Sequence, residues 1–578
     1  MSGALTSILG RVSRLTDRRS EAATRAVLKN LTDVREFTGL SQLPPLREGD
    51  FEAARAGLSG RLIVDGIEWP IAAMTPWDDV DLPPSLDAAL HGFEWLRDFA
   101  ALGTRSARMR ALAWVLGWLD RYAEGSGPGW SVLTTSRRVE NLMCALSFLE
   151  PALNDATGER LTAALPRQIA YLAAAWSGEA ITHHRLRALS GIVLAAGSLE
   201  GFVDVEREHL VLLERQLSET VLPHGALPVR SPEAVLEVLE DLIRVRDVLQ
   251  VAARPQASTI LAAIEALAIT LRATQLSDGT LARFHGGGAG GAGRVDRVLA
   301  QARVRRRPPE EPHMGFVRLQ SGRTVAVIDC ARPPGGGEAI SGHASTLSFE
   351  LSSGRQRLIV NCGPGATFGA EWARSPRTTA AHNTLALDKT SSSKLSPKVR
   401  DDRSAMLVSR PSMVTVSQAR DETGMWLQSR HDGYLADYGL IHERRFFLGA
   451  MGEHIHGEDV LLAPDVKGER RFQSRIKGSE KLGVALALHF HAHPDVVMQL
   501  DLATQLVLMR LPNGETWVFR QSGGQTELET SAYLERGEAE PLRTRQIVVR
   551  ARALTHEATF NWSFVRADPG SARRPARA

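Results

Sequence analysis

Residues 341–365, SGHASTLSFELSSGRQRLIVNCGPG, carry the pattern that decides the fold of the second half of the chain. From Leu347 the odd positions are apolar and the even positions are polar, which is the period of a half-buried β-strand. A Ser-Ser-Gly turn follows, and RLIVN returns as a second strand that ends at Asn361. The alternation places His343 on the apolar side of the first strand. An imidazole there is either a structural histidine or part of a functional site.

The same period continues beyond residue 310. Short runs such as TVAVIDC, NTLALD, ALALHFHAH and QLVLMRL are separated by turns, without helical periodicity between them. Many strands without intervening helices indicate an antiparallel β-sandwich.

Up to about residue 280 the apolar spacing is helical instead. In SPEAVLEVLEDLIRVRDVL, Ser231 can cap a helix, Pro232 suits its first position, and apolar residues recur every three or four positions. The succession of such segments predicts a stacked or closed helical array without a fixed-length repeat. Similar stripes occupy 131–150, 161–176, 184–198, 205–221 and 257–273.

A glycine-rich stretch separates the two halves. Residues 285–293 read HGGGAGGAG and are followed shortly by RVRRRPPEEP, so we expect a flexible loop or linker. The arginines at 305–307 could touch a polyanion, although a solvated linker is the simpler interpretation. The predicted parts are a helical or irregular extension (1–100), a helical domain (101–285), a Gly/Arg/Pro-rich linker (286–311) and a strand-rich domain (312–578).

Composition and length exclude several classes of protein. Lys and Arg exceed Asp and Glu by only three among 578 residues, so no global basicity marks a nucleic-acid-binding protein. Three scattered cysteines cannot form a disulfide framework or a cysteine-based zinc site. The first 30 residues lack a continuous signal-peptide core, and the apolar run at 111–119 is too short to cross a membrane. Sequence alone favours a cytoplasmic protein, with an unusual export route left open.

Polar residues in the helical half suit a sugar acid. GPGWSVLTTSRRVENL supplies Trp130, expected to be exposed, together with Arg138 and Asn141. Arginine pairs with a carboxylate, and tryptophan stacks on a sugar ring. Helix capping and core packing explain the same residues equally well. His183 and His184 stand just before a further apolar helix.

The strand-rich half carries most of the 17 histidines. HDGYLADYGLIHERR supplies His431, Tyr434 and Arg444, and HFHAH places three histidines on one strand face. A His-x-His pair can share a zinc ion, although strand faces lined by histidine without metal are common.

Several segments in order resemble the heparinase II/III-like polysaccharide lyases, namely GHASTLSFELSSG…LIVNCG, TTAAHNTLALD, HDGYLADYGLIHERR and HFHAHPDV. Upstream, LPHGALPVRSP and LSDGTLARFHGG resemble the helical half of bacterial members, so the likeness covers most of residues 100–565. The resemblance implies a multidomain α + β chain, in which an N-terminal (α/α) toroid precedes a C-terminal antiparallel β-sandwich and the active site lies in the cleft between them. It also implies a carbon–oxygen lyase of the cell envelope or periplasm, which cleaves an acidic, uronate-containing polysaccharide or oligosaccharide by β-elimination.

The resemblance also implies roles for particular residues. His343 and His382 match the zinc-site histidines of the family, which implies one zinc ion in the sandwich and no other cofactor. Asn361 stands where the family's carboxylate ligand is usual, and a neutral amide is a poor zinc ligand, which weakens the expectation of zinc. β-Elimination needs a group that neutralises the carboxylate, a base for the C5 proton and an acid for the leaving oxygen. The expected catalytic residues are His183, His184, His343 and Tyr434. The expected substrate-binding residues are Trp130, Arg138, Asn141, Arg230, His431 and Arg444.

One residue of the family pattern is absent. The usual proton donor is the tyrosine of a Ser-Pro-x-Tyr-His motif, and the corresponding SPEAV segment has Ala234 there. Either another group supplies the proton or the reaction has been lost. The alternative function is a non-catalytic glycan-binding or envelope-glycan assembly protein on the same scaffold, and a paired-carboxylate hydrolase ranks last. We expect no nucleic-acid partner and no transmembrane segment, and leave a homodimer open.

Overall fold

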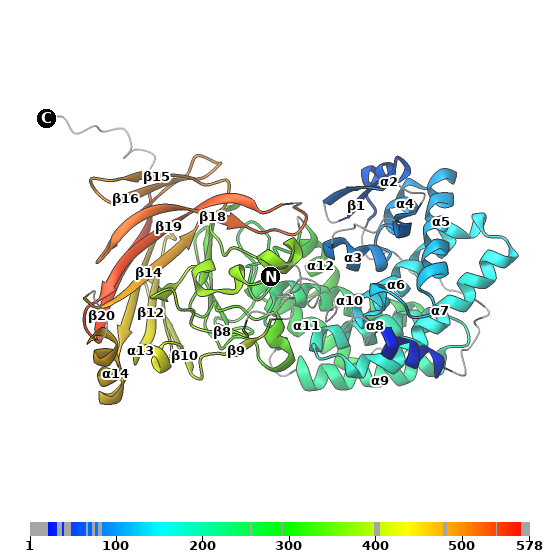
Figure 1. Ribbon diagram of the computed structural model, residues 1–578, viewed down its shortest axis with the longest axis horizontal. Coiled ribbons are helices and arrows are strands. Elements are labelled where there is room, and N and C mark those ends of the chain that lie inside the picture. Colours follow the sequence, from blue (N-terminus) through cyan, green and yellow to red (C-terminus); the bar gives the residue numbers. More distant parts are fainter. Residues whose placement is uncertain are drawn as a thin grey trace, which may run out of the picture. The chain divides into compact units, whose positions relative to one another are not determined.

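A computed structural model describes residues 21–31, 37, 39, 48–64, 67–71, 75–78, 84–222, 225–254, 257–291, 293–397, 405–477, 482–538 and 540–567. The chain divides into two units (Figure 1). The first, called the helical unit, comprises Met1–Pro223, Glu237–Glu265 and Gly537–Ala539, and the second, called the sandwich unit, comprises His224–Leu236, Ala266–Arg536 and Glu540–Ala578. Residues 1–20, which belong to the N-terminal segment without a signal-peptide core, lie outside the described residues.

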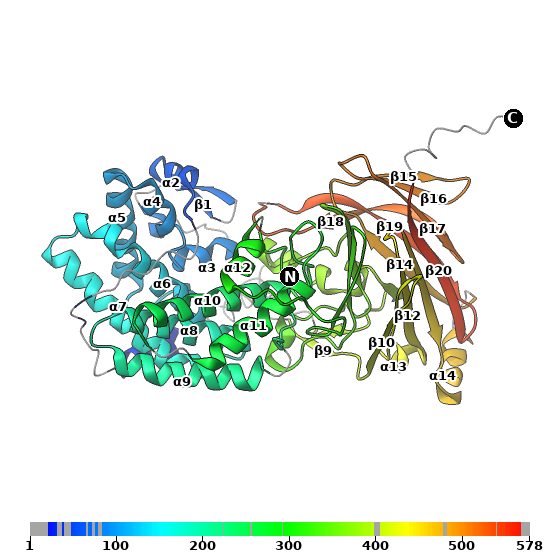
Figure 2. The ribbon, with the colours of Figure 1, turned by 180° about the vertical axis from the view of Figure 1, so that it is seen from behind.

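Helices dominate the first half of the chain, as the apolar stripes predict (Figure 2). A short hairpin of β1 (Arg61–Val64) and β2 (Ile67–Pro70) interrupts them. None of the described helices is long and apolar enough to cross a membrane. The helices are α2 (Phe51–Leu58), α3 (Pro84–His91), α4 (Leu96–Leu102), α5 (Arg105–Tyr122), α6 (Val132–Leu149), α7 (Asp155–Ala175), α8 (Thr182–Ser198), α9 (Val203–Thr220), α10 (Pro232–Val251) and α11 (Ser258–Ala273).

Capping residues and burial explain the helices of the helical unit. The Thr104 hydroxyl accepts the Ala107 N–H at the start of α5, and Ser131 caps α6 in the same way. Asn154 and Thr157 form a reciprocal capping box at the start of α7. Helix α8 packs against both α6 and α9 and is buried on nearly every side, which makes it the core helix of this unit.

Antiparallel sheets dominate the second half. Their strand orders are β3-β4-β5-β6, β18-β19-β14-β7, the pair β8-β9, and the eight-stranded β10-β11-β12-β13-β20-β17-β16-β15. The strands are β3 (Phe316–Ser321), β4 (Thr324–Asp329), β5 (Phe349–Ser353), β6 (Gln356–Ile359), β7 (Leu385–Leu387), β8 (Lys394–Leu395), β9 (Leu407–Ser409), β10 (Val414–Arg420), β11 (Gly424–His431), β12 (Ile441–Gly449), β13 (His454–Leu462), β14 (Val484–His491), β15 (Val497–Asp501), β16 (Leu506–Arg510), β17 (Thr516–Ser522), β18 (Gln525–Tyr533), β19 (Leu542–Ala553) and β20 (Glu557–Arg566). The helices among them are α12 (Arg294–Ala302), α13 (Leu435–Tyr438) and α14 (Val466–Lys477).

Two-residue alternation builds the core of the sandwich. In β14, Leu486, Leu488 and Phe490 are buried while the residues between them are partly exposed. The Phe349 ring of β5 stacks parallel to the Trp562 ring of β20, with centroids 5.5 Å apart. The predicted order, a helical half followed by an antiparallel strand-rich half, is therefore confirmed.

The strand expected to begin near His343 is shorter than the alternation predicts. Strand β5 begins at Phe349, and residues 341–348 are irregular. Leu347 has a φ of +65°, which breaks an extended conformation. His343 therefore precedes the strand and does not head it.

The glycine-rich stretch also differs from the expected flexible linker. It is largely buried and leads into α12. The Gly288 N–H donates to Glu233 (2.8 Å), and the Ala289 N–H donates to Glu535 (3.0 Å). Gly290 and Gly291 have φ values of +85° and +79°, which glycine adopts without strain. The glycines thus let the backbone approach two carboxylates, and those bonds order the segment.

Candidate functional site

A buried group of charged and imidazole side chains lies in the sandwich unit. We call Arg230, His285, Asp329, His343 and His382 the histidine cluster. Asp329 ends β4, and His382 follows a short 3-10 turn, Thr379–Ala381. The His343 Nδ1 lies 3.3 Å from the His382 Nε2, and the His343 backbone N–H donates to the His285 Nδ1 at 3.2 Å. The Arg230 guanidinium donates to the Asp329 carboxylate at 2.5 Å. The structure therefore brings together the two histidines that the sequence paired.

Burial sets the protonation of this cluster. Desolvation lowers the pKa of His343 and His285, and it lowers the pKa of His382 to about 3. Although burial alone would raise the pKa of Asp329, Arg230 and His285 hold it well below its usual range. At neutral pH the three imidazoles are therefore uncharged and the Asp329 carboxyl is ionised.

The His343–His382 contact bears on the expected zinc ion only through its spacing. Two nitrogen ligands of a tetrahedral zinc ion lie about 3.3 Å apart, which the His343–His382 separation of 3.3 Å matches. The Asn361 side-chain oxygen, however, accepts the Ser348 hydroxyl at 2.7 Å and lies 3.4 Å from the backbone N of Asn383. Among the described residues no group of three or more His, Cys, Asp and Glu side chains could hold a metal ion. A structural zinc ion needs three or four protein ligands, and zinc binding by His343 and His382 stays a prediction.

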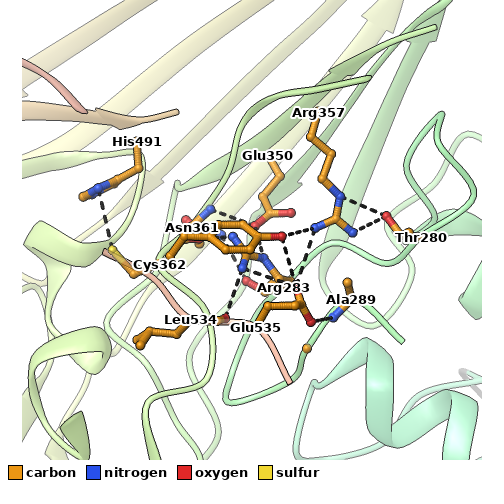
Figure 3. A network of polar contacts seen from close by, with 12 residues as sticks. Thr280, Arg283, Ala289, Glu350, Arg357, Asn361, Cys362, His491, Leu534 and Glu535 are labelled. Atoms are coloured by element: carbon orange, nitrogen blue, oxygen red, sulfur yellow. Dashed lines mark hydrogen bonds and ion pairs between the residues drawn. The ribbon is translucent and has the colours of Figure 1, made fainter. Parts of the chain in front are cut away.

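A second polar network of the sandwich unit surrounds Arg283 and Asn361 (Figure 3). The Asn361 backbone N–H donates to Glu350 at 2.7 Å, and the Arg283 guanidinium lies 3.5 Å from the same carboxylate. Arg283 also stacks 4.0 Å from the centre of the Tyr533 ring and pairs with Glu535 at 3.5 Å. Burial raises the pKa of Glu350, whose second oxygen has no hydrogen-bond partner among the described residues. Arg283 and Glu350 are fully buried, whereas Glu535 is partly exposed, so the network is a largely buried ionic group.

The three other predicted residues of the sandwich unit are also interior. Tyr434 is fully buried, and its hydroxyl donates to the Leu385 carbonyl at 2.8 Å. The His431 Nδ1 accepts the Gly433 N–H at 3.0 Å. The Arg444 guanidinium binds Asp459. Each of these side chains is bonded to the protein itself, and their assigned roles in catalysis or substrate binding stay predictions.

In the helical unit the expectation of an exposed tryptophan is wrong. Trp130 is 5% exposed, and its indole N–H donates to the Tyr122 carbonyl at 2.7 Å. The buried Arg138 guanidinium donates to Gln168 at 2.7 Å and to the Gly129 carbonyl at 2.5 Å. The Arg138 guanidinium also lies 5.2 Å from the centre of the Trp130 ring, so both side chains are enclosed in the helical core, as the packing alternative predicts.

Of the remaining predicted residues of the helical unit, His183 is buried, and Asn141 and His184 are half-buried. Asn141 is half-buried and donates to the Gly92 carbonyl at 2.8 Å. The His183 ring contacts the His184 ring edge-on at 4.4 Å, and burial holds the pKa of His183 well below its usual value. The His184 Nδ1 lies 3.7 Å from Glu179. Whether these residues share a cleft with the sandwich unit stays a prediction.

The HFHAH histidines do not form one ligand set. The His489 and His491 rings stack with centroids 6.1 Å apart. The His491 Nδ1 lies 2.7 Å from the Ser531 hydroxyl, and its Nε2 lies 2.9 Å from the Ala380 carbonyl. Strand β14 ends at His491, so His493 no longer follows the strand alternation.

Comparison with known proteins identifies the chain's relatives. A family model described as Heparinase II/III-like, C-terminal, matches residues 303–563. FtsZ-localized protein C of Caulobacter vibrioides is 31% identical over 522 residues, which cover 88% of this chain and 87% of that protein. The chain belongs to the heparinase II/III-like family.

Solved structures show the family fold in full. The alignment with the structure of heparinase III covers 98% of this chain and 92% of the heparinase III chain, with a TM-score of 0.71 at 12% identity. A mutant of the heparan sulfate lyase HepC from Pedobacter heparinus covers 95% and 88% with a TM-score of 0.58 at 14% identity. The fold of this heparinase II/III-like protein is a helical toroid followed by a β-sandwich.

Several interior residues of this family member escaped the sequence reasoning. Asp329 and Glu350 stand in apolar strands, and His285 begins the glycine run. A charged residue within an otherwise apolar strand was the available signal, because such a residue needs a buried partner. The partners themselves lie too far along the chain for any local pattern to reveal.

Proposed function

We propose that this protein recognises an acidic glycan without cleaving it and works where FtsZ works in the dividing cell. The observation that supports a non-catalytic role is the state of the proton donors. The position of the family tyrosine is a buried alanine, Ala234. The substitute donor, Tyr434, is fully buried, and its hydroxyl is bonded to the Leu385 carbonyl.

Three other buried tyrosines are engaged in the same way, and of these the Tyr533 hydroxyl accepts from Arg357 and donates to Glu535, both at 3.1 Å. The Tyr171 hydroxyl donates to the Trp130 carbonyl at 2.5 Å, and the Tyr438 hydroxyl lies 2.9 Å from the Thr390 hydroxyl. A general acid must come within hydrogen-bond reach of the leaving oxygen, and a hydroxyl enclosed by protein atoms does not reach a polymer. β-Elimination therefore lacks its acid among these residues.

The proposed ligand, an acidic glycan, and the proposed location, the division site, are both inferred from proteins that this chain resembles. The family and the fold are those of polysaccharide lyases, which supports an acidic glycan as the ligand. The relative with 31% identity over nearly the whole chain is named for its localisation with FtsZ, which supports a role at the division site. A scaffold that keeps the fold and lacks the acid suits recognition better than turnover.

Two measurements test this proposal. The purified protein is titrated with a panel of uronate polymers in a calorimeter, and the same mixtures are followed for the near-ultraviolet absorbance of the conjugated double bond that β-elimination creates. We expect binding without an absorbance rise. A fluorescent fusion should gather at the division site and disperse when FtsZ is depleted. A uniform distribution in dividing cells would contradict the second part.

A uronate lyase that acts by β-elimination is the second candidate, because His343 and His382 keep two uncharged imidazoles in contact at 3.3 Å, although both are buried. A neutral imidazole can take the C5 proton. An absorbance rise in wild-type protein that is lost in His343→Ala would establish this candidate. Loss of the same activity with a chelator, and its return with zinc, would place a zinc ion at His343 and His382.

A further inference from the structure

The outer face of the eight-stranded sheet carries two parallel rows of side chains. Strand pairing sets Trp426 beside Phe447 and Phe447 beside His456, and it sets Gln428 beside Arg445 and Arg445 beside Glu458. Because side chains alternate along a strand, both rows point away from the core, which the intervening residues of β11 and β12 enter. The aromatic row comprises Trp426, Phe447 and His456, and the polar row comprises Gln428, Arg445 and Glu458.

The aromatic row is held rigidly. Trp426 is 45% exposed, yet its indole N–H donates to the Asp421 carboxylate at 3.1 Å. That carboxylate is fixed in turn by the Thr423 N–H at 2.8 Å and the Thr423 hydroxyl at 2.6 Å. The Trp426 and Phe447 ring centroids lie 4.2 Å apart, and the His454 ring packs edge-on against Phe447 at 6.2 Å. A side chain already held in place loses little conformational freedom when a ligand binds.

The polar row is balanced in charge. Arg445 lies 2.9 Å from Glu443 on its own strand and 3.2 Å from Glu458 on the next. Two carboxylates around one guanidinium offer no excess positive charge, so the row does not favour an anionic ligand. The two rows line a groove of about 350 Å³, within the size range of small-ligand sites.

We propose that this groove binds a chain of neutral pyranose units joined by equatorial linkages. Such a chain is flat, with apolar C–H faces and hydroxyl groups at its edges. The C–H faces would stack on the aromatic row, and the hydroxyls would bond to the polar row. Neighbouring strands lie about 4.8 Å apart, so the aromatic rings of the row follow one another from strand to strand. A saccharide chain stacked on these rings would therefore run across the strands.

The pattern favours a saccharide over a protein partner. A stable protein interface buries about 800 Å² on each side around a continuous apolar centre, whereas this face offers one narrow aromatic row beside a fully polar one. The inference goes beyond the proposed function, because it adds a neutral glycan on an outer sheet face and does not depend on how an acidic glycan is bound.

Calorimetric titration of the full chain tests this inference. The probes are the β-linked hexamers of N-acetylglucosamine and of glucose, with a uronate hexamer for comparison. We expect wild-type protein to bind a neutral hexamer, Trp426→Ala to bind it at least tenfold more weakly, and Trp426→Phe to keep most of the affinity. Leu508→Ala is the matched control, because Leu508 is 44% exposed on β16 of the same sheet. This variant should bind as wild type does.

Three outcomes would overturn the inference. Wild-type protein could bind neither neutral hexamer, Trp426→Ala could bind as well as wild type, or Leu508→Ala could lose as much affinity as Trp426→Ala. Equal melting temperatures of the variants would show that the fold is intact in each comparison. If the Trp426→Ala variant bound the uronate hexamer as tightly as wild-type protein does, the proposed recognition of an acidic glycan would be supported. The groove would then have no part in that recognition.

Discussion

Replacing Asp459 by Asn should strongly destabilise the protein. This carboxylate of β13 is fully buried and accepts two hydrogen bonds from the Arg444 guanidinium, at 2.8 and 2.9 Å. It also accepts the indole N–H of Trp562 at 2.7 Å and lies 2.7 Å from the His442 Nε2. Although burial alone would raise the pKa of Asp459, Arg444 and His442 hold it well below its usual range.

The magnitude follows from what the substitution leaves behind. Asparagine preserves the volume but not the charge, so the Arg444 guanidinium, which is 1% exposed, remains buried without a counter-charge. Breaking one partner of a buried ion pair costs about 3–5 kcal/mol. Arg444 also donates to the carbonyls of Leu347 and Asn383 at 2.8 and 2.7 Å, so the loss should spread toward the histidine cluster.

Urea unfolding followed by tryptophan fluorescence measures this loss, because Trp562 and Trp517 lie in the same core. Glu453→Gln is the matched control. It removes a carboxylate that pairs with Arg566 at the surface, where ion pairs contribute about 0–1 kcal/mol. If the free energy of unfolding of Asp459→Asn fell by less than about 1 kcal/mol, or by no more than that of Glu453→Gln, the buried Arg444–Asp459 pair would not be what stabilises the sandwich.

Three further predictions concern acid, thiols and packing. Burial lowers the pKa of His343, His382 and His431 below the ordinary value near 6.5, so the unfolded chain binds more protons. The free energy of unfolding should therefore be full above about pH 6.5 and fall by roughly 1.4 kcal/mol per histidine for each pH unit below it, and equal urea midpoints at pH 7.5 and 5.5 would refute this. Burial raises the pKa of the three thiols, Cys144, Cys330 and Cys362, to about 11 or 12. Mass spectrometry should therefore find no iodoacetamide adduct on native protein at pH 8 and three adducts after denaturation. Rapid labelling of native protein would contradict the burial of the thiols. Gly457→Ala would press a methyl group into the Trp562 ring and should cost about 1–3 kcal/mol, while Gly158→Ala, which meets nothing within 4 Å, should leave the melting temperature the same or higher.

Local patterns determined the type of each half of the chain. Period 3.6 before residue 280 and period 2 after residue 310 depend only on neighbouring residues, and both survive in the folded protein. Family motifs, which combine residues far apart in sequence, also paired His343 with His382 correctly. The same motifs placed Asn361 beside them, whereas its amide is bonded to Ser348 and lies next to Asn383.

Only the tertiary structure decided which polar groups face water and which face one another. Trp130, Arg138 and Tyr434 have the composition of a sugar-binding site, yet the fold encloses all three. The glycine run has the composition of a linker, yet carboxylates from 55 and 246 residues away bind its backbone. Burial and charge pairing depend on where distant segments meet. A periodic pattern shows which face of a helix or strand is apolar. It does not show which other segment packs against that face, because that segment lies elsewhere in the chain.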